Sequence, residues 1–240
     1  IIDTLKLRNL DVAYTEYNPI SQKRGTIYFQ DFGGNVFNVT NDSLQLMKNN
    51  HAIANLHAMV MKTSRIDVAI NFNLTAANAA FTYKGSVAPM DMMVLNPVAK
   101  NMGLVEIESG KMQKTVFDIK ANENGSSGTV GFFYTNLKVK LLKEGELGEP
   151  PKKKGLLSFI ANSFVIKDEN PKKGEDPRIA NVTFKRTPAA SFFNLLWKSV
   201  FIGMRENIGL GMIKPKTPEQ AMKKVNEKKE ERKKKKKRTL

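Results

Sequence analysis

Apolar and polar residues alternate along most of the chain, a pattern typical of β-strands with one apolar and one wet face. The clearest example is residues 65–75, where five apolar side chains fall on one side: Ile66, Val68, Ile70, Phe72 and Leu74. Residues 80–87 repeat the pattern with three apolar side chains that alternate with polar ones: Phe81, Tyr83 and Val87. Only a short connection separates the two runs, so we expect them to pair as a hairpin.

Further strands follow from the same periodicity. Residues 4–14 predict a strand with a bulge at Asn9, because the alternation changes phase there. Residues 25–32 and 35–40 predict two strands that flank a turn at Gly33 and Gly34. Later strands are predicted at residues 104–110, 114–121, 128–142 and 178–186, with a loop at residues 122–128 whose glycines, together with Gly131, we attribute to turn geometry.

Helical periodicity is confined to three places. Residues 90–103 predict a short helix that Pro97 breaks. Residues 155–164 predict an amphipathic helix. The clearest helix is residues 191–209, with Ser191 as its N-cap. Its apolar arc is too wide for an ordinary surface helix, so this helix either plugs the end of a sheet or lies on a membrane.

These elements predict a mainly β protein with a few helices. We expect a long curved antiparallel sheet that forms an open groove, capped by C-terminal amphipathic helices. Residues 1–150 would form the groove, and residues 151–210 the helices and a closing strand. Residues 211–240 would form a lysine-rich tail that is disordered or helical.

Charge is concentrated at the end of the chain. The 240 residues hold 39 Lys and Arg against 23 Asp and Glu, a net charge of +16. Residues 214–240 hold 13 of these cations and 4 glutamates, a net of +9. Seven cations are consecutive: Arg232, Lys233, Lys234, Lys235, Lys236, Lys237 and Arg238. Such a block either stays a solvated tail or binds polyanions, which include phospholipid headgroups, nucleic acid and acidic protein.

The residues that most enzymes need do not gather in this sequence. It has no cysteine, which excludes disulfides, thiolate zinc sites and a cysteine nucleophile. His51 and His57 have no carboxylate nearby in sequence, so we expect no metal site and no cofactor. No phosphate-binding loop, nucleophile elbow or carboxylate pair is visible. We therefore expect a protein that is not an enzyme. No stretch reaches the roughly 20 apolar residues that span a bilayer.

Several short motifs occur in an informative order. They lie at residues 38–42 (NVTND), 83–91 (YKGSVAPMD), 95–99 (LNPVA), 107–112 (IESGKM), 128–142 (GTVGFFYTNLKVKLL), 156–162 (LLSFIAN), 170–174 (NPKKG) and 191–204 (SFFNLLWKSVFIGM). In this order the chain resembles the C-terminal region of AsmA-like envelope proteins, in the form seen in Bacteroidota. The lysine-rich C-terminal segment of this chain is longer than the family pattern requires.

This resemblance implies a periplasmic protein, anchored in the inner membrane through a segment outside this chain. It also implies a sheet whose groove carries phospholipid acyl chains between the inner and outer membranes. The groove would be lined by the hairpin's apolar residues: Ile66, Val68, Ile70, Phe72, Leu74, Phe81, Tyr83 and Val87. The last helix would present residues to a membrane interface: Phe193, Trp197, Lys198, Phe201 and Arg205. The tail would add attraction to anionic headgroups.

Two other functions remain open. In the first, the apolar strand faces form an ordinary closed core against the helix that contains Trp197. The chain would then be a scaffold subunit of a cell-envelope complex, with a basic tail that binds an acidic partner protein. In the second, the chain binds nucleic acid through residues 232–238. We rank nucleic acid last, because the folded part has scattered cations and no RNA-binding signature.

Overall fold

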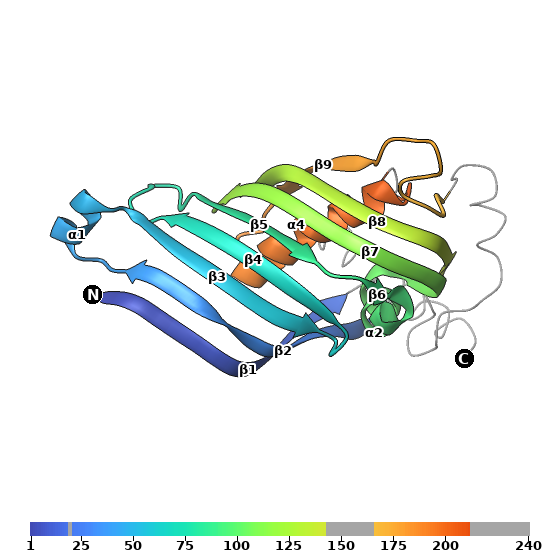
Figure 1. Cartoon of the computed structure of the whole chain (residues 1–240), viewed down its shortest axis with the longest axis horizontal. Coiled ribbons are helices and arrows are strands. Elements are labelled where there is room, and N and C mark those ends of the chain that lie inside the picture. The colour runs from blue at the N-terminus through green and yellow to red at the C-terminus, as the bar shows by residue number, and fades with distance from the viewer. Residues whose placement is uncertain (19–20, 143–165, 212–240) are drawn as a thin grey trace, which may run out of the picture.

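The fold is dominated by long strands. The computed structural model describes residues 1–18, 21–142 and 166–211. The strands are β1 (Ile2–Asn18), β2 (Lys23–Val39), β3 (His51–Val60), β4 (Ser64–Asn73), β5 (Phe81–Val87), β6 (Met90–Asp91), β7 (Val105–Asn122), β8 (Gly125–Leu141) and β9 (Ile179–Lys185). They form one nine-stranded sheet in the order β1-β2-β3-β4-β5-β7-β8-β9, with β6 paired to β7 (Figure 1). All pairs are antiparallel, so the mainly β, open-sheet prediction is confirmed.

The helices are α1 (Ser43–Lys48), η1 (Met92–Leu95), α2 (Asn96–Val98), η2 (Ala99–Gly103) and α4 (Phe192–Asn207). The helix predicted at residues 191–209 is confirmed, and its Ser191 cap accepts a hydrogen bond from the Asn194 amide at 3.1 Å. The short helix predicted around Pro97 exists as three successive pieces, η1, α2 and η2. Helix α1 was not predicted. The helix predicted at residues 155–164 lies outside the described residues.

The central hairpin and the first bulge are confirmed. Strands β4 and β5 pair antiparallel as the predicted hairpin, with Ile66 opposite Val87 and Ile70 opposite Tyr83. In β1 the register shifts on both sides of Leu10. Asn9 has a φ of +52° there, a conformation that asparagine tolerates better than most residues.

The prediction of a turn at Gly33 and Gly34 is wrong. Strand β2 continues through both glycines. Position 34 needs a glycine because a Cβ there would lie 2.1 Å from the Asn55 carbonyl oxygen of β3. The chain does reverse within the predicted loop at residues 122–128, but the turn is only Glu123 and Asn124, between β7 and β8. Strand β8 already begins at Gly125, and a Cβ on Gly128 would lie 2.2 Å from the Asp118 oxygen. Gly34 and Gly128 therefore serve close approach between neighbouring strands, not a reversal of the chain. Residues 104–110 and 114–121 likewise belong to one strand, β7, with shifts in its register.

The sheet curls around α4. This helix packs on β8 and β9 at one edge of the sheet. Its opposite side reaches β1 at the other edge, where the Trp197 indole Nε1 donates to Glu16 Oε2 at 3.1 Å. Figure 1 shows α4 running along one face of the sheet, which we call the inner face. The core lies there, around residues such as Ile119, Val130 and Leu195, which are at most 1% exposed.

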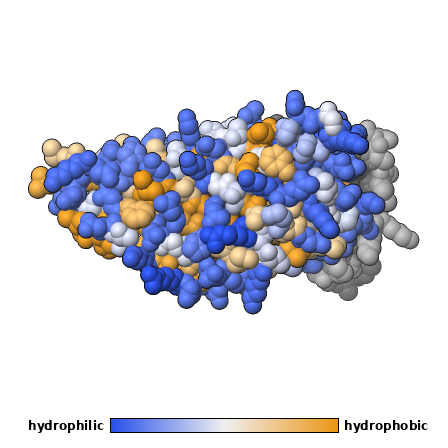
Figure 2. Space-filling model, in the orientation of Figure 1, coloured by the Kyte–Doolittle hydropathy of each residue, from blue (hydrophilic) through white to orange (hydrophobic). Residues whose placement is uncertain are grey.

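The outer face of the sheet is mostly polar, as Figure 2 shows. Apolar residues gather toward the end that carries α1, where Leu44 is 68% and Met47 84% exposed. Among the described residues, no helix is long and apolar enough to cross a membrane.

Candidate functional site

An apolar cavity of about 310 Å³ lies between the inner face of the sheet and α4. Most strands of the sheet, the η1–α2–η2 segment and α4 all contribute to its walls. Representative lining residues are Val12, Phe29, Leu56, Val68, Met112 and Leu196. The cavity follows from the strand periodicity, because the apolar side of each strand faces inward while one helix covers several strands.

One end of the cavity is closed by the η1–α2–η2 segment. Asp91 caps η1 by accepting the Met93 amide at 2.9 Å. At the other end of the segment, the Asn18 amide nitrogen donates to the carbonyls of Asn101 and Met102 at 3.1 and 3.0 Å. The segment is therefore held between β7 and the end of β1.

Three phenylalanines cluster where the N-terminus of α4 meets β4 and β5, outside the residues that line the cavity. The Phe81 ring centroid lies 5.6 Å from that of Phe72 and 5.3 Å from that of Phe192. Aromatic rings at these separations attract one another beyond their burial of surface. The N-terminus of α4 thus meets β4 and β5 through an apolar plug.

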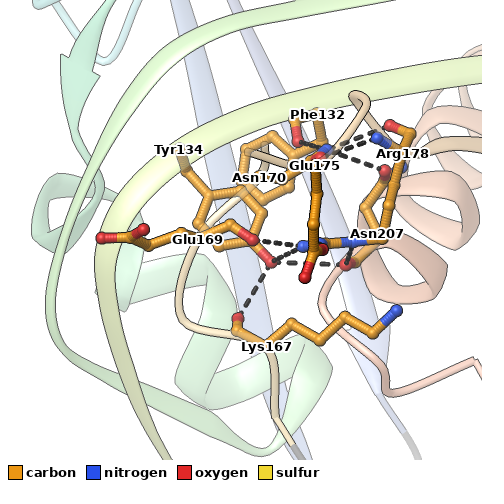
Figure 3. A network of polar contacts seen from close by, with 8 residues as sticks. All are labelled: Phe132, Tyr134, Lys167, Glu169, Asn170, Glu175, Arg178 and Asn207. Carbon is orange, nitrogen blue, oxygen red and sulfur yellow. Dashed lines mark hydrogen bonds and ion pairs between the residues drawn. The ribbon is translucent and has the colours of Figure 1, made fainter. Parts of the chain in front are cut away.

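A buried polar network fixes α4 on β8 (Figure 3). The Asn207 side chain donates to the Val130 carbonyl at 2.9 Å. The Asn170 side chain donates to the carbonyls of Phe132 and Arg178 at 2.5 and 3.0 Å and to Asn207 Oδ1 at 3.2 Å. The Tyr134 hydroxyl donates to the Lys167 carbonyl at 2.9 Å. Since the sheet, α4 and the segment before β9 share this network, α4 has a fixed position on this side.

Side chains alone close the cavity on the β1 side. Glu16 accepts from Trp197 Nε1 at 3.1 Å and pairs with Lys198 Nζ at 2.9 Å. We call these three residues the rim contact. The Tyr14 ring lies 6.2 Å from that of Phe193 beside it. No described strand or helix lies between β1 and α4 at this seam.

The structure places the predicted groove residues in three groups. Five line the cavity: Ile66, Val68, Ile70, Tyr83 and Val87. Phe72 and Phe81 belong to the aromatic plug. Leu74 lies beyond the plug and is 37% exposed. The alternation along β4 and β5 therefore identified one wall of the cavity.

The predicted membrane-interface residues lie against the sheet. Four of them line the cavity: Phe193, Trp197, Phe201 and Arg205. The fifth, Lys198, belongs to the rim contact. The predicted tail site, residues 232–238, lies outside the described residues.

Sequence reasoning missed Glu16 as a site residue. Along β1, Leu10, Val12 and Tyr14 alternate on the inner face, and Glu16 continues the same row. A carboxylate in an apolar row is the signal that identifies this position. Other missed residues, such as Phe29 and Met112, reach the cavity from strands with irregular register.

Two hydroxyl groups in the cavity wall have partners within the protein. The Tyr83 hydroxyl donates to the Leu196 carbonyl at 3.1 Å, and the Thr115 hydroxyl to Met112 Sδ at 3.0 Å. Burial raises the pKa of Tyr83 to about 12. Burial also lowers the pKa of Arg205, whose guanidinium lies 5.9 Å from the Phe201 ring centroid. Both pKa shifts have burial as their main cause, which indicates that this part of the cavity wall is poorly hydrated.

Tyr83 gives a pH-dependent prediction. Folded Tyr83 keeps its proton up to about pH 12, whereas an unfolded tyrosine loses it above about pH 10. Stability is therefore expected to fall between pH 10 and 12, by up to about 2.7 kcal/mol for two pKa units. Urea unfolding across this range checks it. Tyr83→Phe should flatten the fall, and Tyr28→Phe, on an exposed residue, should not. Equal slopes in wild type and Tyr83→Phe would contradict the prediction.

No protein-family model, curated protein or solved structure matches the chain. In the part of the chain that the structure describes, no three His, Cys, Asp or Glu side chains gather as metal ligands would. The fold and the cavity thus define the class coarsely: a curled antiparallel β-sheet that encloses an apolar cavity with a C-terminal helix.

Proposed function

We propose that this chain is a lipid-transfer module, not an enzyme, and that it shields phospholipid acyl chains in the cavity between the sheet and α4. The observation that carries the proposal is the cavity of about 310 Å³ with apolar walls. Small-molecule sites in proteins have volumes from about 300 Å³ and mostly apolar linings. An apolar wall is sufficient to bind an acyl chain, and a transfer protein performs no reaction on the lipid that it carries.

The energy of an unfilled cavity supports an apolar occupant. The cavity is partly open to solvent and its walls are almost wholly apolar, so without a ligand this surface stays in contact with water or unfilled, at a cost of roughly 25 cal/mol per Å² of apolar surface. Water gains few partners there, because the Tyr83 and Thr115 hydroxyls of the wall already donate within the protein. Each buried CH₂ group of an acyl chain contributes about 0.8 kcal/mol instead.

The order of motifs that resembles AsmA-like proteins supports the cellular setting of this proposal. In that setting the chain lies in the periplasm, anchored in the inner membrane through a segment outside it, and phospholipid passes between the two membranes for outer-membrane maintenance. Residues 232–238 would hold the chain near anionic headgroups, with about 1 kcal/mol per cation close to the surface.

A scaffold role in an envelope complex is the second candidate. The apolar residues exposed near α1, Leu44 and Met47 among them, favour it, since such patches mark protein contacts. In that case the cavity is an imperfectly filled core, and the tail binds an acidic partner.

A pair of adjacent β1 variants tests the transfer proposal. Val12 lines the cavity, whereas Ala13 is exposed on the outer face. Val12→Trp places an indole in the lipid path, so transfer of a fluorescent phospholipid between vesicles is expected to fall about tenfold or more, the equivalent of ~1.4 kcal/mol in lipid affinity. Ala13→Trp adds the same group to the outer face and should leave transfer unchanged.

Three results of this assay are informative. A loss in Val12→Trp alone supports the cavity as the path. Equal transfer by both variants and wild type contradicts it. A folded wild-type chain that neither binds nor transfers phospholipid would favour the scaffold role.

A further inference from the structure

The rim contact resembles an anion-binding site in which the protein's own Glu16 carboxylate is the bound anion. The Glu16 carboxylate accepts one hydrogen bond from the Trp197 indole and one charge-assisted hydrogen bond from the Lys198 ammonium. The Tyr14 hydroxyl adds a third, longer contact at 3.4 Å. The side chains of Lys198 and Glu16 are only 25% and 22% exposed, so this is not an ordinary surface ion pair.

The donors of this contact stand where the hydrocarbon wall ends. Trp197 lines the cavity with its ring, which lies 4.7 Å from the Phe201 ring, while its Nε1 points to the rim. Lys198 follows it directly in the sequence. A molecule with its hydrocarbon in the cavity would therefore place a polar head beside Trp197 Nε1 and Lys198 Nζ. The apolar wall and the two donors together match an anionic amphiphile.

The β1 side is also the side of the cavity that can separate most readily. β1 is an edge strand and is hydrogen-bonded in the sheet only to β2. On the β8 side, α4 is held by buried groups. The Asn207 side chain donates to the Val130 carbonyl, and the Ser199 hydroxyl lies 2.6 Å from the Ser126 hydroxyl. Across this seam β1 also meets α4 through Tyr14, whose ring packs on Phe193 and whose hydroxyl accepts from the Asn194 side chain at 3.5 Å. Loss of the rim contact would therefore loosen β1 from α4, and would not detach α4 from β8.

We propose that Trp197 Nε1 and Lys198 Nζ bind the anionic head, carboxylate or phosphate, of an amphiphile whose chain fills the cavity, and that this head replaces Glu16. The inference rests on the proposed function. Both heads present the oxygen acceptors that Glu16 presents. Without a ligand, Glu16 compensates the partly buried charge of Lys198, which would otherwise lack a partner at this rim. Binding of the head releases Glu16 and opens the seam through which the chain passes.

Three ligands with the same hydrocarbon test this inference. Oleate and oleyl phosphate carry anionic heads, and oleyl alcohol carries a neutral one. Their affinities are measured by titration of the full chain below micelle-forming concentrations. Inorganic phosphate alone serves as the arm without hydrocarbon and is expected not to bind measurably.

Variants of the rim contact give opposite expectations. Glu16→Gln removes the competing charge at nearly constant size, so the preference for oleate over oleyl alcohol should rise about tenfold, as ~1.4 kcal/mol in binding would give. Lys198→Gln removes the cation, so that preference should fall to about parity. Glu108→Gln, on an exposed residue of β7, removes a carboxylate elsewhere and should change nothing.

Each outcome separates the inference from the proposed function. If all three oleyl ligands bind but neither rim variant changes the preference, the inference is overturned and the apolar cavity still binds chains. If no oleyl ligand binds the wild-type chain, both fail. Binding of inorganic phosphate as tight as that of oleyl phosphate would show an anion site unrelated to the cavity and also overturn the inference. Circular dichroism identifies a misfolded variant, and the other rim variant then decides.

Discussion

Replacement of Asn170 by alanine is expected to destabilise the protein by about 3–5 kcal/mol, because several buried backbone groups lose their partner together. Asn170 is 0% exposed. Its side-chain nitrogen lies within hydrogen-bonding distance of three oxygens, on β8, on α4 and just before β9, and its Oδ1 accepts from the Arg178 amide at 2.8 Å. Each polar group left buried without a partner costs about 1–3 kcal/mol.

Urea unfolding measures this loss directly. Asn181→Ala is the matched control, since Asn181 is exposed on β9 close in sequence to Arg178. The control is expected to change stability by less than about 0.5 kcal/mol. Amide hydrogen exchange at Arg178 should accelerate in Asn170→Ala, because that amide loses its acceptor. A loss no larger than that of the control would mean that the network in Figure 3 does not hold the segment.

Gly203→Ala is expected to destabilise the protein by about 3 kcal/mol, although alanine is the better helix former. In an exposed helix this change would add about 1 kcal/mol of stability. Here a Cβ on Gly203 would lie 2.4 Å from Val130 Cβ, so α4 or β8 has to shift. Overpacking of this kind costs about 1–3 kcal/mol and occasionally more.

A double-mutant cycle isolates this contact. Val130→Ala alone should be destabilising, because it empties a fully buried site. With Gly203→Ala it removes the two Val130 methyl groups, which lie 2.6 and 3.0 Å from the new Cβ, but keeps Val130 Cβ. Part of the clash is relieved, so the double variant is expected to lose less stability than the sum of the single losses. Strict additivity of the two losses would contradict close packing of α4 on β8.

The sequence predicted the elements whose evidence is local. Strands β4 and β5 and their pairing as a hairpin were predicted correctly, because their inner and outer residues differ clearly, as Val68 and Asn71 do. The Ser191 cap marked the start of α4 for the same reason. Gly34 and Gly128 were wrongly predicted to lie in a turn and a loop. A glycine in the sequence indicates a turn and a close contact between strands equally well, so the local sequence does not separate the two.

The cavity could be predicted only in part. Its hairpin wall and the apolar row of α4 follow from periodicity, but its volume depends on the separation of α4 from the sheet. That separation is set by contacts between distant residues, such as Gly203 with Val130 and Asn170 with Phe132. Nothing local in the sequence relates Glu16 on β1 to Lys198 on α4, which lie near opposite ends of the described chain.

The meander order of the sheet has a consequence for the order of assembly. From β1 to β5, each strand pairs with the strand that follows it in the chain, so this half of the sheet can form from contacts of short range. Helix α4 comes last in the described chain, and Trp197 meets Glu16 across a separation of 181 residues. During synthesis the apolar face of the early strands therefore exists before its cover does. At this stage the inner face of the early strands is exposed to solvent. An apolar ligand that binds there is then covered when α4 docks on the sheet.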